Sequence, residues 1–434
     1  MGIAGWLKSR TLVACSLLLI VAAVWGCASK TSRVLMPTPL ALTLGLPHPG
    51  GDLREGCDCA NDEMPVFVVS GRNIKDTSQR FNPFGNDRSP KPSIGTAFVR
   101  VGDGLTSDEI YEETTTKKSR KRTKVVLDRF ELGNVPLHVD PWGVEDEVVR
   151  HQDNPWVQAI QAQMDRSGNR NLTIFVHGYN TEFIDNTLLA GEIFHYIGRQ
   201  GAMLSFEWPS ESRLLGYIAD KGNANYSTRL FRALISNVAK ECNVDSITII
   251  AHSAGSPIVV NALREIRLLE FNRSAEEIQQ LYRINRVVLA APDMDLMAFA
   301  NAVRDRFYEM TKGVAVYASP KDRALKLSEK LYGNSRLGRS VGQLQEWEQK
   351  LFQEVPQLEM VDASVAEKQF RNLVGHSYFH RDPWVSSDIG AFILGRSPEY
   401  RGLIKTEDDP VFWQFPKDYP ERLKQKAVSS KTNF

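Results

Sequence analysis

Ser253 lies in the segment "SITIIAHSAGSP", residues 246–257, where an apolar β-branched run stops at a turn of small residues. A serine on a tight strand-to-helix turn can act as a nucleophile, and the turn needs small residues two positions before and after it. Ala251 and Gly255 meet that need, although Ala251 stands where the usual G-x-S-x-G pattern has glycine. The pattern predicts a nucleophilic serine, with a buried structural hydroxyl as the alternative.

A serine nucleophile needs an imidazole that takes its proton and an acid that holds the imidazole in one tautomer. In hydrolases that carry the serine on such a turn, the chain order is serine, acid, histidine. Asp322 follows the predicted strand "GVAVYAS", and His376 lies about a dozen residues after the predicted strand "LEMVD". We therefore expect Asp322 as the acid and His376 as the base, with Asp293 and Asp295 of "AAPDMD" as rivals for the acid.

His380 competes with His376 in the segment "GHSYFHRD". Two histidines at this spacing can also be metal ligands on one helical turn, but no third ligand is evident beyond Asp382, and no H-E-x-x-H occurs. We expect neither a metal nor an organic cofactor.

Attack on a carbonyl creates an oxyanion, which such enzymes hold with backbone N–H groups. The segment "IFVHGYN" ends an earlier predicted strand at His177 and Gly178. A turn at this place, together with the residue after the nucleophile, would supply the N–H groups of Tyr179 and Ala254. We expect the His177 side chain to bond to its own loop.

Another predicted strand ends in "FEWPSES", with Glu207 and Trp208 as candidate pocket residues. The alternative is that Trp208 packs over the strand end while Asp220, Asn223 and Ser227 cap the next helix. The full set of candidate pocket residues is His177, Gly178, Glu207, Trp208, Asp293 and Asp295.

Alternating strands and helices must position these residues. After residue 150, predicted strands begin near 172, 202, 246, 284, 313 and 358, with helical stretches such as 184–198 between them. Val/Ile/Ala-rich strands separated by amphipathic helices predict a mostly parallel sheet with helices on both faces. Earlier short strands, at 65–70, 95–102, 123–130 and 136–140, predict an antiparallel edge.

Seven segments in order carry a family resemblance: "FVHGYN", "FEWPS", "AHSAGSPIVVNAL", "LAAPDMD", "YASPKDRALKLS", "GNSRLG" and "GHSYF". Over roughly 65–395 the chain resembles a bacterial α/β-hydrolase family catalogued as domain of unknown function nine hundred. The resemblance implies the α/β-hydrolase fold, Ser253 as nucleophile, Asp322 as acid and His376 as base. It also implies an oxyanion hole at the turn after Gly178.

Two residues depart from that family, whose members have serine before Trp-Pro-Ser and methionine after the nucleophile. Here those positions are Glu207 and Ala254. A carboxylate at this strand end could repel anionic substrates or point outward.

The first 27 residues resemble a lipoprotein signal. Lys8 and Arg10 precede the apolar run "TLVACSLLLIVAAVWG", which is short for a membrane span. The ending "VWGC" resembles a lipobox, although Trp25 departs from the usual small residue, so we expect lipidation of Cys27. Ala28, in place of aspartate, resembles proteins sorted to the outer membrane. An uncleaved signal anchor and plain secretion remain alternatives.

The remaining organisation is a flexible Pro/Gly/Thr-rich tether at 28–62, a hydrolase domain at 63–397 and a C-terminal extension at 398–434. Segment 325–356 could be a lid or an ordered surface helix pair. The net charge of +1 gives no reason to expect nucleic acid, and we assign Cys57 and Cys59 no role.

These patterns predict a lipid-anchored hydrolase of the cell envelope, facing the periplasm, that acts on a small-molecule or lipid ester. The alternatives are a non-catalytic binding protein on the same scaffold and a peptidase or amidase.

Overall fold

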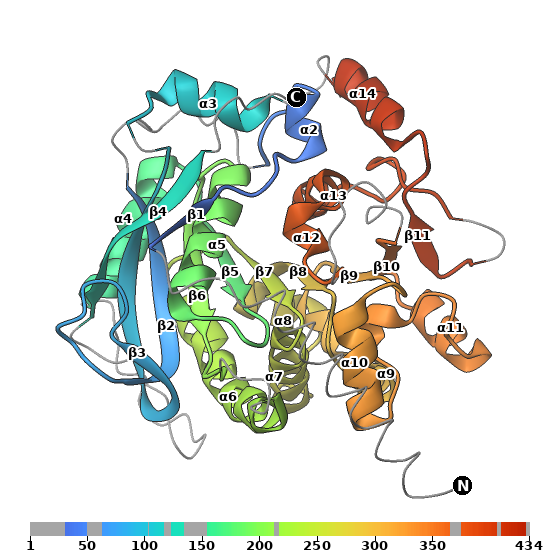
Figure 1. The fold of residues 1–434 in the computed structure, drawn as a ribbon. Coiled ribbons are helices and arrows are strands. Elements are labelled where there is room, and N and C mark those ends of the chain that lie inside the picture. Colours follow the sequence, from blue (N-terminus) through green and yellow to red (C-terminus); the bar gives the residue numbers. More distant parts are fainter. Residues whose placement is uncertain are drawn as a thin grey trace, which may run out of the picture.

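The computed structural model describes residues 31–49, 63–102, 104–116, 123–133, 154–211, 217–364, 375–405 and 409–430. In these residues one 11-stranded sheet runs through the molecule in the order β1-β4-β3-β2-β6-β5-β7-β8-β9-β10-β11 (Figure 1). Its strands are β1 Ser32–Val34, β2 Met64–Ile74, β3 Phe84–Val101, β4 Lys124–Leu132, β5 Asn171–Val176, β6 Ala202–Glu207, β7 Ser246–His252, β8 Ile284–Ala290, β9 Val314–Ala318, β10 Leu358–Asp362 and β11 Phe412–Gln414.

The sheet has two parts that differ in strand direction. The pairs β1–β4, β4–β3 and β3–β2 are antiparallel. Every pair from β2–β6 to β10–β11 is parallel. The predicted parallel sheet with an antiparallel N-terminal edge is therefore confirmed. The carboxyl ends of the parallel strands all lie on the same side of the sheet. In open α/β sheets, ligands bind on that side.

Helices cover both faces of this sheet, and side chains that alternate along the strands divide most of the core into two large clusters. One cluster receives α4 Pro155–Ser167, α6 Tyr217–Glu241, α7 Gly255–Leu269, α8 Ala275–Tyr282, α9 Leu296–Arg304 and α11 Glu346–Gln353. The other receives α2 Leu40–Thr43, α3 Ser107–Thr115, α5 Phe183–Tyr196, α10 Arg323–Tyr332, α12 Tyr378–Arg381, α13 Pro383–Ile393 and α14 Tyr419–Ser430.

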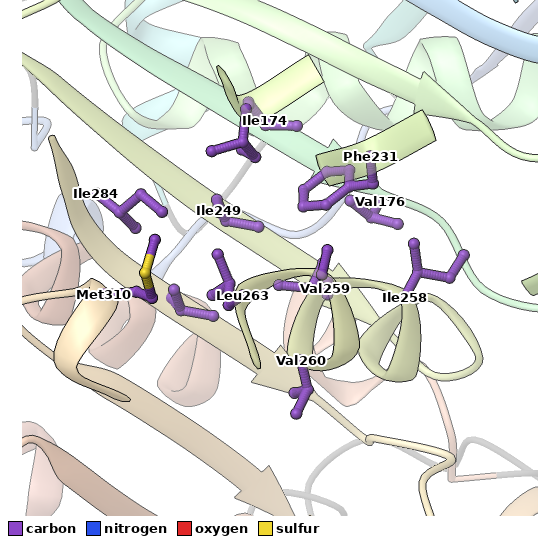
Figure 2. Packing of buried hydrophobic residues seen from close by; sticks show 14 of the residues in the cluster. Ile174, Val176, Phe231, Ile249, Ile258, Val259, Val260, Leu263, Ile284 and Met310 are labelled. Atoms are coloured by element: carbon purple, nitrogen blue, oxygen red, sulfur yellow. The ribbon is translucent and has the colours of Figure 1, made fainter. Parts of the chain in front are cut away.

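The core beside the predicted nucleophile is aliphatic and closely packed. Figure 2 shows Ile174 and Val176 of β5 and Ile249 of β7 beside Phe231 of α6 and the apolar side of α7. Ile174, Val176 and Ile249 are fully buried, and the strands pair in register as Val176 with Ala251. This packing fixes where β5 and β7 end relative to each other.

Both chain ends differ from the predicted domain limits. In the predicted tether, the described residues 31–49 form β1, which pairs with β4, and α2, whose Leu40 and Leu42 are buried. In the predicted C-terminal extension, β11 pairs with β10 and Tyr419 of α14 is buried. The Pro- and Gly-rich composition of the tether suggested flexibility. However, apolar residues between the prolines and glycines pack against the hydrolase domain.

Segment 325–356 contains most of α10, the 3-10 turn η4 Leu337–Arg339 and α11. Leu337 is buried, and its N–H donates to the Met294 carbonyl at 2.8 Å. Trp347 is half-buried against the core, with the Arg304 guanidinium 4.9 Å from its ring centroid, whereas Leu331 is exposed. In this structure the segment lies on the surface as ordered helices.

Several predictions fall outside the described residues: the signal and lipobox with Cys27, the strand at 136–140, and Cys57 and Cys59. Among the residues that are described, no helix combines the length and apolar character needed to cross a membrane.

Candidate active site

The turn between β7 and α7 holds Ser253 in a strained backbone conformation. Its φ is 52°, in the left-handed region that residues with a Cβ seldom adopt. Two positions later, a Cβ on Gly255 would lie 2.4 Å from the His177 carbonyl oxygen and 2.8 Å from that of Val176. Glycine is therefore required at 255. Ala251 is tolerated at the other position because its methyl group lies in the apolar core.

Three side chains from three different strand ends form one hydrogen-bonded chain. Ser253 Oγ donates to His376 Nε2 at 2.8 Å, and His376 Nδ1 donates to Asp322 Oδ2 at 2.7 Å. Asp322 is fully buried, and its second oxygen accepts from the Leu325 N–H at 3.0 Å as the N-cap of α10. The helix start therefore fixes the carboxylate that orients the imidazole.

The environment of His376 favours a proton acceptor. Burial by itself lowers the pKa of this imidazole, but the charge and hydrogen bond of Asp322 and the charge of Asp293 outweigh it, so the pKa is raised above its ordinary value. A raised pKa makes the imidazole a stronger base toward the serine proton.

The rival acids have other partners. Asp293 accepts from Ser328 Oγ at 2.7 Å and lies 3.4 Å from the Arg336 guanidinium. Asp295 is the N-cap of α9 and accepts from the Ala298 N–H.

The neighbouring histidines, His252 and His380, differ from His376 in their surroundings and in the direction of their pKa shifts. His252 Nε2 donates to the His376 carbonyl oxygen at 3.1 Å, and burial together with the nearby His376 lowers the pKa of His252 to about 3. His380 is buried, and burial lowers its pKa well below the ordinary value. Among the described residues, no group of three His, Cys, Asp or Glu side chains could hold a metal ion.

The turn after β5 approaches the nucleophile very closely. A Cβ on Gly178 would lie 3.0 Å from the Cβ of Ser253 and 2.9 Å from Nδ1 of His252, so glycine permits this approach. The His177 imidazole donates from Nδ1 to the Gly178 carbonyl oxygen at 2.8 Å. Tyr179 follows in the same turn, and Ala254 directly precedes α7. The two predicted oxyanion donors thus belong to turns in mutual contact.

Glu207 and Trp208 are fully buried, so neither contributes surface to a pocket. Trp208 stacks on the His177 ring, with centroids 5.1 Å apart, and its indole N–H donates to the His177 carbonyl oxygen at 2.8 Å. The expectation that Glu207 repels substrate or points outward is wrong. β6 is an interior strand, and β2 beside it brings Arg72 to within 3.7 Å of the Glu207 carboxylate.

Asp220 also differs from its predicted capping role. Its carboxylate accepts from Ser210 Oγ at 2.9 Å and from the Glu211 N–H at 2.8 Å, and it thereby holds these two residues, which follow β6. Ser210 Oγ in turn accepts from the Asn180 N–H of the turn after β5 at 2.9 Å. Sequence reasoning missed Ser210 and Arg72, although an arginine inside the apolar strand "VFVVSGRN" was a usable signal.

A search of curated proteins gives no significant match. Among solved structures, the chain is similar to esterase B from Lactobacillus rhamnosis inhibited by a tributyrin phosphonate, at 14% identity, with 62% of this chain and 81% of the esterase covered and a TM-score of 0.30. It is also similar to a lipase-esterase related protein from Clostridium acetobutylicum, at 13% identity, with 53% of this chain and 95% of the other covered and a TM-score of 0.27.

Likeness at these TM-scores carries no argument about this chain. The family model for an alpha/beta hydrolase of unknown function (DUF900) matches residues 154–395. This match covers more than half of the chain and includes β5 to β10 with every strand end described above. The chain therefore belongs to this family of alpha/beta hydrolases.

Proposed function

We propose that this protein is a serine hydrolase that cleaves carboxylic esters. Ser253 is the nucleophile, His376 the general base and then the general acid, and Asp322 the residue that orients His376. The observation that carries the proposal is the hydrogen-bonded chain from Ser253 Oγ through His376 to Asp322. No metal or organic cofactor takes part in this chemistry.

The reaction has two halves. Ser253 Oγ bonds to the ester carbonyl carbon while its proton moves to His376 Nε2, and the N–H groups of Tyr179 and Ala254 hold the oxyanion. Each donor contributes about 3 kcal/mol to transition-state stabilisation. The C–O bond to the alcohol then breaks, and the leaving oxygen takes the proton from Nε2. Water attacks the acyl-enzyme with His376 again as base, which releases the acid and restores Ser253.

Esters are favoured over amides by the leaving group. An alkoxide leaves a tetrahedral intermediate more readily than an amide nitrogen, and the sequence contains no evident insertion for an extended peptide. A series of p-nitrophenyl esters of increasing acyl length tests both catalysis and pocket depth. Cleavage of a peptide or amide substrate with no ester turnover would replace this proposal by a peptidase or amidase.

The first experiment is active-site labelling with a fluorophosphonate probe. We expect the purified protein to be labelled and Ser253→Ala to abolish the labelling. Ser256→Ala is the matched control, because Ser256 lies three residues away, is buried, and its Oγ has no hydrogen-bond partner in the described chain. A folded wild-type protein that resists the probe would indicate a binding protein on a hydrolase scaffold.

We also propose that Cys27 carries a lipid anchor that holds the protein at the outer membrane, facing the periplasm. The basic residues, the apolar run and "VWGC" support this location. The test is the mass of the mature N-terminal peptide from cells. Diacylglyceryl-modified Cys27 is expected, and an unmodified Cys27 would rule the anchor out.

A further inference from the structure

Arg72 of β2 is a buried arginine that joins two loops beside the nucleophile. Its side chain is 1% exposed, and Nη2 donates to the Thr181 carbonyl oxygen at 2.8 Å. Nη1 donates to the Ser210 carbonyl oxygen at 3.2 Å and to Asn86 Oδ1 at 3.3 Å. The guanidinium thus ties the end of the turn after β5 to the loop after β6.

Glu207 supplies the buried counter-charge. Arg72 Nε and Glu207 Oε2 face each other at 3.7 Å, and neither atom has a hydrogen-bond partner among the described residues. The other carboxylate oxygen, Oε1, accepts from Asn186 Nδ2 at 2.5 Å and from Ser205 Oγ at 2.9 Å. A buried charge without a partner is costly, so this carboxylate keeps the guanidinium in its place.

His177 connects Arg72 to the turn. Arg72 Nη2 lies 3.4 Å from His177 Nε2, while His177 Nδ1 lies 2.8 Å from the Gly178 carbonyl oxygen. Burial, and next the charge of Arg72, hold the pKa of His177 well below its ordinary value, so the imidazole is neutral. A neutral imidazole can accept from the guanidinium at Nε2 only if Nδ1 carries the proton. Nδ1 is then the donor in the hydrogen bond to the Gly178 carbonyl oxygen.

The Gly178 carbonyl group belongs to the same peptide unit as the Tyr179 N–H group. This unit is planar and trans, so its C=O and N–H groups point in opposite directions. Thr181 Oγ1 also donates to the Gly178 oxygen, at 3.1 Å. Fixing this oxygen on one side therefore fixes the direction of the Tyr179 N–H group on the other.

We propose that Arg72 is a positioning residue that, with Glu207 as counter-charge and His177 as relay, aims the Tyr179 N–H group at the oxyanion. The inference rests on the proposed function for its catalytic consequence. The donor is engaged chiefly in the transition state, so disturbing it lowers kcat and leaves KM nearly unchanged.

Arg72→Lys keeps the positive charge but loses the planar guanidinium group and its arrangement of N–H donors. We expect kcat for p-nitrophenyl acetate to fall about tenfold to a hundredfold, since a small misplacement of an aligned group has an effect of this order, with little change in KM. Glu309→Gln is the stability control, because it breaks another buried pair, Glu309 with Arg267 near the far end of α7 at 2.8 Å. It should lower Tm without lowering kcat. A change in KM alone for Arg72→Lys, or equal kcat losses in both variants, would overturn the inference.

Two variants of His177 separate the relay from packing. His177→Phe keeps a ring to stack on Trp208 but loses the donor to Gly178, whereas His177→Asn loses the ring and keeps a donor near the place of Nδ1. The inference expects His177→Asn to retain the higher kcat. If His177→Phe is the more active variant, stacking on Trp208 is what matters and the relay is refuted.

The ionisation of Glu207 gives a further readout. Burial raises the pKa of Glu207 to about 7, against the charge of Arg72 and the hydrogen bonds of Asn186 and Ser205. His177 Nε2 also faces this carboxylate, at 3.6 Å, but stays neutral. Because protonated Glu207 resembles glutamine, the ratio of kcat between wild type and Glu207→Gln should grow as pH rises through about 7. A pH-independent ratio contradicts the counter-charge role.

Amide hydrogen exchange in the turn at 177–181 tests the inference even if the wild-type protein shows no hydrolysis. In that case the proposed function fails, and Arg72→Lys should still speed exchange in the peptide that covers 178–181. Unchanged exchange in this peptide would show that Arg72 does not hold the turn.

Discussion

The two turns that meet at the candidate site are built in different ways. The turn at Ser253 is shaped by its own sequence, since Gly255 removes the Cβ that would strike the end of β5. The turn at 177–181 is held from outside, by Arg72, Trp208 and Ser210. The first kind of turn can be recognised in a short stretch of sequence, and the second only in three dimensions. Variants that weaken one turn and spare the other can test this difference.

The largest expected effect concerns the acid that serves the first turn. Asp322→Asn should lower kcat by about 10⁴-fold, because the amide stabilises the wrong tautomer of His376. Asp293→Asn is the matched variant and should stay within about tenfold of wild type, because Asp293 influences His376 through its charge, whereas Asp322 also makes the hydrogen bond. Steady-state hydrolysis of one ester by both variants decides. The reverse order of effects would move the acid to Asp293.

The two glycines should respond differently to alanine. Gly255→Ala sets a methyl group against backbone oxygens and should destabilise the fold by about 1–3 kcal/mol or more. Gly178→Ala sets it against the Ser253 and His252 side chains, at 3.0 and 2.9 Å, and should lower kcat by about a hundredfold with a smaller change in stability. Thermal unfolding and kcat, measured together, compare the two. Equal Tm losses with equal kcat losses would contradict the distinction.

Removing one external support should have a modest effect. Trp208→Phe retains an aromatic ring over His177 but loses the indole donor to the His177 carbonyl oxygen. One such hydrogen bond is worth about 1 kcal/mol, so we expect kcat to fall by no more than about tenfold. The measurement is kcat at constant temperature beside a circular dichroism spectrum. A loss as large as that of Asp322→Asn would mean that Trp208 does more than support the turn.

The smallest expected effect is a shift in pH dependence. His376 must be deprotonated to act as base, so kcat/KM should rise with pH through its raised pKa. The negative charge of Asp293 helps to raise that pKa, and Asp293→Asn should therefore lower it and preserve activity to a lower pH. The pH profile of kcat/KM measures the shift. Movement of the inflection to higher pH would contradict the assignment of that charge.

The difference between the turn at Ser253 and the turn at 177–181 also explains how far the sequence could predict the site. Strand ends and chain order led to Ser253, Asp322 and His376, which the structure brings into one hydrogen-bonded chain. The burial of Glu207 could not be predicted, because its partner Arg72 lies 135 residues earlier and reaches it only through the β2–β6 pairing. A sequence pattern of about ten residues can predict the local backbone geometry of a turn. Which charged side chains lie next to each other depends on the pairing of strands that are distant in the sequence.

The fold was predictable to a similar extent. The alternation of strands and helices after residue 150 indicated the parallel sheet, because its apolar strands are distinctive in composition. The ends of the chain were harder to judge. β1 and β11 are three residues long and acquire their structure from β4 and β10.

The pairing of β11 with β10 has a practical consequence for anyone who expresses this protein. A fragment that stops at 397 would expose the backbone N–H and C=O groups of β10 as a new sheet border, together with the apolar surface that Phe412 and Tyr419 cover. Such a border invites other chains to pair with it and precipitate. The smallest soluble product is expected to extend through α14, well past the last residue that the family shares.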